Sequence, residues 1–137
     1  MERLDEQQIM AIYSKASNEW TRLTCKPEAM ERMQAIAPNQ SDAWQGLGVA
    51  IVHALILDDL LGLKGHPNPT YVHLVQEVID GIQGKLEGHL DYQLAALVIP
   101  ASIENIRDIS MNQERMPAKS TYFFPKLVSG LVVHQLT

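Results

Sequence analysis

Trp44–Leu63, which reads WQGLGVAIVHALILDDLLGL, is the stretch that decides the fold expected for this chain. It is an apolar run of helix length, and its only ionisable side chains are those of His53, Asp58 and Asp59. A helix that is apolar on all sides must be surrounded by protein or lipid. We therefore expect a buried central helix over about residues 42–62, with the rest of the chain packed around it.

This helix is not expected to cross a membrane. Its histidine and two aspartates would be costly near the centre of a bilayer, and the Gly- and Pro-containing loop at 64–69 is typical of a turn within a domain. The N-terminus, MERLDEQQ, lacks the apolar core of a secretory signal. Cys25 is the only cysteine, which suits a reducing compartment. The sequence therefore favours a cytoplasmic protein without a membrane partner.

Length and charge exclude some classes of function. A chain of 137 residues is expected to form one domain, with a core large enough to fold without a disulfide or a metal. Its net charge of −5 argues against nucleic-acid binding, which needs clustered Lys and Arg side chains to neutralise phosphates. The sequence contains neither a phosphate-binding glycine loop nor a Gly-x-Ser-x-Gly elbow, and we expect no cofactor.

Glycine and proline divide the remaining sequence into helix-length pieces. One apolar stripe at spacings of three and four predicts an amphipathic helix over 5–23, and it consists of Ile9, Tyr13, Ala16, Trp20 and Leu23. A second helix is predicted from Pro27 to about Pro38, because proline is favoured at the first helical position. Further helices are predicted over about 69–87 and over 90–111, the latter interrupted at Pro100. The segment 121–137 fits a helix and, because of its β-branched residues, a strand almost as well.

These pieces predict an all-α fold. The expected architecture is a single α-helical domain over 1–137, a compact bundle of six or seven short helices around the apolar central helix, with a helix or a strand at the C-terminus. A small domain with so much apolar surface is also a candidate homodimer, since two-fold dimers are the commonest oligomers.

Asp58 and His53 are the candidate catalytic residues of the central helix. At about 100° per residue, Asp58 projects from the same side as Ile51 and Ala54. A carboxylate in such an apolar stripe is costly unless it is paired, hydrogen-bonded or protonated. It is therefore either a tuned acid, base or metal ligand, or one half of a structural ion pair. His53 points to a different side and is either a ligand or a hydrogen-bonded core residue.

His73, Glu77 and Asp80 are the candidate metal ligands. Their spacings of four and three place the three side chains on one face of the predicted helix over 69–87. Imidazole and carboxylate groups in this arrangement can hold a divalent metal. The apolar stripe of the same helix points nearly the opposite way, so the alternative is an ordinary polar surface facing water.

The sequence predicts a non-enzymatic protein that binds another protein or a small apolar ligand. No catalytic constellation converges in the sequence, and Cys25 is expected to be an inert thiol. Tyr122, Phe123 and Phe124 are the candidate partner-binding residues, because aromatic residues are enriched at interfaces. One alternative is a small metal-dependent hydrolase that uses Asp58 with the carboxylates of Glu77 and Asp80. Another alternative is a small-molecule sensor with an apolar pocket beside His53.

Overall fold

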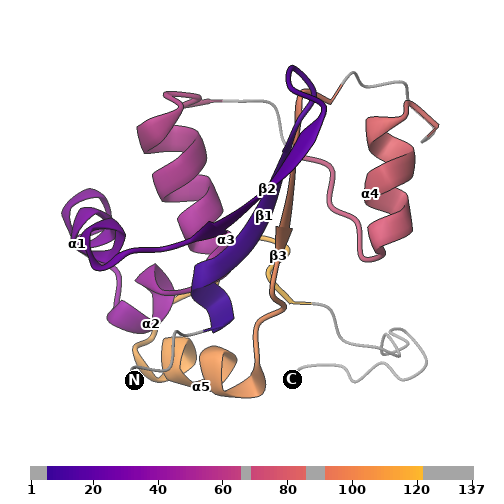
Figure 1. Ribbon diagram of the computed structural model, residues 1–137. Helices are drawn as coiled ribbons and strands as arrows, with labels where there is room; N and C mark the ends of the chain where they lie inside the picture. Colours follow the sequence, from indigo (N-terminus) through magenta and orange to yellow (C-terminus); the bar gives the residue numbers. More distant parts are fainter. Residues whose placement is uncertain (1–5, 66–68, 86–91, 122–137) are drawn as a thin grey trace, which may run out of the picture.

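A three-stranded antiparallel sheet lies at the centre of the fold (Figure 1). The structure is a computed structural model, and it describes residues 6–65, 69–85 and 92–121. In chain order the elements are η1 (Glu6–Gln8), β1 (Ile9–Ser14), β2 (Glu19–Thr24), α1 (Pro27–Ile36), α2 (Asp42–Gln45), α3 (Gly48–Ala50), η2 (Ile51–Leu60), α4 (Val75–Ile82), β3 (Leu94–Val98) and α5 (Ile103–Met111). The prediction of an all-α helical bundle is therefore wrong.

The expected helix over 5–23 is a β-hairpin. β1 pairs with β2 in an antiparallel register from Ile9↔Thr24 to Ser14↔Glu19. The turn between them closes through Asn18, whose φ of 55° lies in the left-handed region that asparagine tolerates better than most residues. Residues 9–13 are apolar at every position, so β1 can be packed on both faces as a strand. The apolar spacing of three and four residues in this stretch therefore did not identify the correct secondary structure.

β3 completes the sheet in the order β2-β1-β3. It pairs antiparallel with β1, and Met10 lies opposite Val98. Its sequence, LAALV, consists largely of good helix formers, which is why the spacing predicted a helix there. Pairing with a strand far away in the sequence overrides that local preference.

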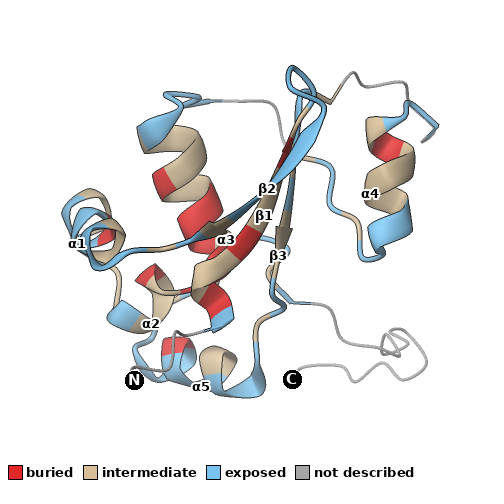
Figure 2. Cartoon of the chain, in the orientation of Figure 1, coloured by how far each residue is buried: buried red, intermediate tan, exposed pale blue. Residues whose placement is uncertain are grey.

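One face of the sheet packs on helices. Met10, Leu23 and Val98 are neighbours in register and belong to the same apolar cluster as α1 and η2. Figure 2 shows the buried positions gathered where β1 meets the α3–η2 helix. The buried members of this core are Met10, Met33, Leu47, Ala50, Ile51, Val52, Leu55 and Ile109. In Figure 1, α5 closes the lower end of this layer and α4 stands apart beyond β3.

The predicted central helix is divided into α2, α3 and η2, and the last of these is a π-helix. Ser41 caps α2 through a 3.3 Å bond from the Trp44 N–H, and the helix breaks at Gly46 before α3. From Ile51 to Leu60 the chain forms a π-helix, η2, in which each hydrogen bond spans five residues instead of four. The side chains therefore advance by a smaller angle per residue than the 100° assumed from the sequence.

The first residues of the other helices agree with the predicted starts to different extents. α1 begins at Pro27, as predicted from the preference of proline for this position. α4 begins at Val75, well after Pro69, and α5 begins only after Pro100, with Ser102 as its cap. None of the helices within the described ranges has both the length and the apolar character needed to cross a membrane.

Candidate functional site

Two of the three predicted metal ligands, Glu77 and Asp80, accept hydrogen bonds from groups of α4 or of the residues just before it. The Glu77 carboxylate accepts hydrogen bonds from the backbone N–H groups of Leu74 and His73, each at 2.9 Å. Asp80 accepts a 3.0 Å bond from the side chain of Gln76. Across the described residues, no group of three or more His, Cys, Asp or Glu side chains is placed to hold a metal ion. The structure therefore does not bring Asp58 together with Glu77 and Asp80.

We expect the stabilisation of the start of α4 by the Glu77 carboxylate to depend on pH. The N–H groups of Leu74 and His73 lower the pKa of Glu77. Because the pKa is lower in the folded state, the stabilisation is complete above the usual glutamate range and is lost as the pH falls through the lowered value. We expect the Leu74 and His73 amide resonances to titrate together in NMR spectra below pH about 4.3, the ordinary glutamate pKa. A midpoint at or above the ordinary value, or the same titration in Glu77→Gln, would contradict this assignment.

Asp58 and Asp59 have different surroundings at the end of η2. Asp59 forms a bidentate ion pair with Arg32 of α1, in which both N–O distances are 2.8 Å. The hydrogen bonds from Arg32 lower the pKa of Asp59. Asp58 is half-buried, and it makes no hydrogen bond or ion pair in the part of the chain that the structure describes. The sequence singled out Asp58, but Asp59 is the carboxylate that meets a basic side chain.

His53 lies next to an aromatic residue from the segment that follows η2. Its Nε2 is 3.4 Å from the hydroxyl of Tyr71, and the two ring centroids are 6.4 Å apart. His53 does not line either of the two hollows identified in the described residues. The predicted partner-binding residues Tyr122, Phe123 and Phe124 lie outside the described residues.

An open apolar groove runs between β2, α1 and η2. Its volume is about 430 Å³. It is lined by Met10, Leu23, Thr24, Cys25, Lys26, Glu28, Ala29, Ile51, Leu55, Ile56 and Leu60. Met10, Ile51 and Leu55 are core residues, so the floor of the groove is the hydrophobic core itself. The charged side chains of Lys26 and Glu28 are exposed and lie at its rim.

The π-helix determines which side chains face the groove. A bond that spans five residues gives roughly four and a half residues per turn. Spacings of four, five and nine then fall on one face, which is the spacing of Ile51, Leu55, Ile56 and Leu60. The same geometry moves Asp58, seven residues after Ile51, away from that face. In an α-helix the reverse would hold, and Asp58 would share a side with Ile51.

Cys25 lies in the groove at the junction of β2 and α1. Its backbone N–H donates a 3.0 Å bond to the Gln8 carbonyl, which fixes the end of β2 beside β1. The residue is half-buried, and desolvation raises the pKa of its thiol. The thiol is therefore mainly neutral near pH 7.

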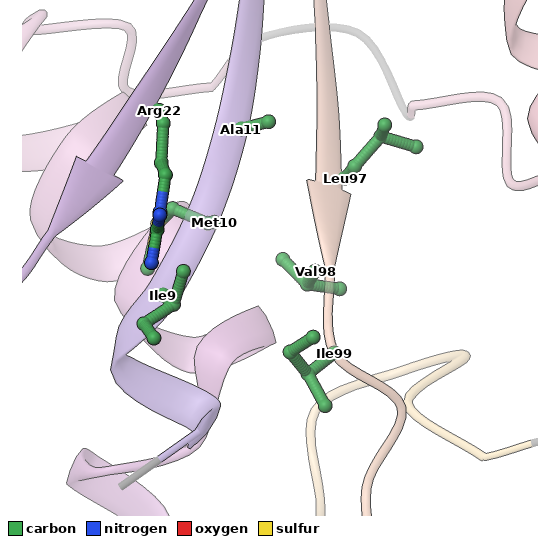
Figure 3. Close-up of a pocket in the computed structure, with 7 residues that line it drawn as sticks. All are labelled: Ile9, Met10, Ala11, Arg22, Leu97, Val98 and Ile99. Atoms are coloured by element: carbon green, nitrogen blue, oxygen red, sulfur yellow. The ribbon is translucent and has the colours of Figure 1, made fainter. Parts of the chain in front are cut away.

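A smaller hollow of about 290 Å³ lies on the opposite face of the sheet. Figure 3 shows Ile9, Ala11 and Arg22 on one side of it and Leu97 and Ile99 on the other. These side chains come from all three strands or from the residue that follows β3. The hollow is shallow and apolar apart from Arg22. It contains no pair of groups suited to acid–base chemistry.

Comparisons with known proteins do not extend this description. No protein-family model matches the chain, and no curated protein or solved structure is significantly similar to it.

Proposed function

We propose that this protein binds a small, mainly apolar molecule in the groove between β2, α1 and η2, and that it performs no chemistry on it. The observation that carries the proposal is that core side chains form the floor of an open groove. Met10, Ile51 and Leu55 are themselves buried, but they line the space between the three elements. An occupant would therefore contact the apolar core directly.

The size and lining of the groove suit a small ligand. A volume of about 430 Å³ lies in the range of about 300–1,000 Å³ that is usual for small-molecule sites. Such sites combine an apolar lining with a few polar groups that fix the orientation of the ligand. Here Thr24, Lys26 and Glu28 supply the polar groups at the rim. We therefore expect an amphipathic ligand whose apolar part lies on the core and whose polar end lies near Lys26.

The π-helix supports the same site. π-helical segments are rare and are found frequently at functional sites. In this chain the wide turn brings Leu60 onto the groove face, together with Ile51 and Leu55. Leu60 is 66 % exposed, so its apolar side chain is in water unless an occupant covers it.

We also propose that the protein is located in the reducing cytoplasm, because its sequence contains a single cysteine.

The test compares two neighbouring leucines in a ligand-binding titration. The probe is 8-anilino-1-naphthalenesulfonate, which has an apolar ring system and an anionic end. Leu60→Ser should weaken its binding about 5- to 10-fold, because loss of the apolar contact is worth roughly 1 kcal/mol. Leu61→Ser is the matched control, since Leu61 is 50 % exposed and does not line the groove. Its affinity should stay within twofold of that of the unchanged protein.

A second readout uses Cys25 as a reporter inside the groove. A saturating probe should slow the alkylation of the Cys25 thiol by iodoacetamide, because the occupant covers it. Equal loss of affinity in Leu60→Ser and Leu61→Ser, or an alkylation rate that the probe does not change, would refute binding in this groove.

A further inference from the structure

One edge of β3 presents backbone groups that have no hydrogen-bond partner among the residues that the structure describes. Lys15 N–H donates a 2.9 Å hydrogen bond to the Gln93 carbonyl, in register with the ladder between β1 and β3. Hydrogen-bonded and non-hydrogen-bonded pairs alternate along an antiparallel ladder. Ala95 and Leu97 therefore direct their N–H and C=O groups toward β1. Leu94, Ala96 and Val98 direct theirs outward.

Nothing in the described ranges pairs with these outward groups. β3 is at the edge of the sheet, and none of its backbone groups is hydrogen-bonded to α4, which lies beyond it in Figure 1. Natural edge strands are usually protected by charged side chains, proline or bulges. β3, with the sequence LAALV, has no charged residue and no proline. The other edge strand, β2, carries Glu19 and Arg22.

We infer that β3 pairs antiparallel with β3 of a second copy of this chain, around a two-fold axis at Ala96. In this register Ala96 lies opposite itself and Leu94 lies opposite Val98 of the partner subunit. All three outward-facing residues of each copy then form hydrogen-bonded pairs. The arrangement is independent of the groove, and it joins the two sheets into one six-stranded sheet.

The composition of β3 favours a second copy as the occupant. A residue at a two-fold axis meets its own copy, so a charged residue there would face a like charge. Ala96 is small and uncharged, and the Leu94–Val98 pairs are apolar. An interface of two five-residue strands is small, so the dimer should be weak and reversible.

The first test is sedimentation equilibrium over total concentrations from about 10 µM to about 1 mM. The average mass should rise from 15.3 kDa toward twice that value. Ala96→Pro should stay monomeric and folded, because proline is tolerated on an edge strand where its missing N–H would face outward. The control is Ala11→Lys in β1, which alters the outer face of the sheet and leaves the edge intact. It should dimerise like the unchanged protein.

The second test needs no variant. Amide hydrogen exchange at Ala96 should slow as the protein concentration rises, whereas Ala95, whose N–H faces β1, should be protected at every concentration. The inference is overturned if the mass stays at that of the monomer at all concentrations. It is also overturned if Ala11→Lys abolishes the dimer, or if the exchange rate of Ala96 does not depend on concentration. Either of these results would place the contact elsewhere on the surface.

Discussion

Met33→Ala is expected to lower the free energy of unfolding by about 2–5 kcal/mol, the usual cost of truncating a fully buried methionine. Met33 is 0 % exposed and belongs to the cluster that joins α1 to η2 and β1. Alanine keeps the helix propensity of α1, so the loss reflects the removed apolar contacts and the cavity left behind. Urea unfolding followed by circular dichroism measures it as a lower midpoint with an unchanged slope.

Met111→Ala is the matched control for this experiment. Met111 ends α5 and is 75 % exposed, so the same chemical change should alter the free energy of unfolding by less than about 0.5 kcal/mol. If both variants lost the same stability, Met33 would not be a core residue, and the packing of α1 on η2 would be wrong.

The sequence predicted the elements that local chemistry specifies. α1 begins at Pro27, where proline fixes a suitable φ and its missing N–H costs nothing. The Ser41 hydroxyl, which caps α2, is another local signal, because serine at this position accepts the bond from an N–H of the first turn. Both signals act within a few residues, so they do not depend on the rest of the fold.

The sheet could not be predicted in the same way. β1 and β3 are far apart in the sequence, and their pairing is decided by partners that no local window contains. Residues 9–13 are apolar at every position, so they lack the alternation that marks a half-buried strand. In β3, alanine and leucine favour a helix locally, and the pairing with β1 overrides that preference.

The groove was missed for a related reason. Two of its walls come from segments whose geometry was predicted incorrectly, since β2 was assigned to a helix and η2 was treated as an α-helix. With 3.6 residues per turn, Ile51 and Leu60 do not share a side. The π-helical turn that brings them onto one side is not marked by the apolar pattern of the sequence.

Gln7→Leu is expected to lower the free energy of unfolding by about 1–3 kcal/mol, because it leaves a buried backbone N–H without its partner. The Gln7 side chain is buried and joins two distant segments. Its Oε1 accepts a 3.2 Å bond from the Gly48 N–H at the start of α3, and its Nε2 donates a 2.9 Å bond to the Pro100 carbonyl after β3. Leucine has a similar volume and replaces neither bond.

Gly48 makes this junction especially intolerant of change. A Cβ at this position would lie 2.9 Å from the Gln7 carbonyl oxygen, so η1 and α3 are in contact through their backbones. In Gln7→Leu the amide hydrogen of Gly48 should exchange with solvent faster. Urea unfolding should separately show the lower free energy of unfolding. Gln83→Leu, at an exposed glutamine, should leave both quantities nearly unchanged. If Gln7→Leu behaved like Gln83→Leu, the Gly48 N–H would have another partner, and the side chain of Gln7 would not hold α3 against the end of β3.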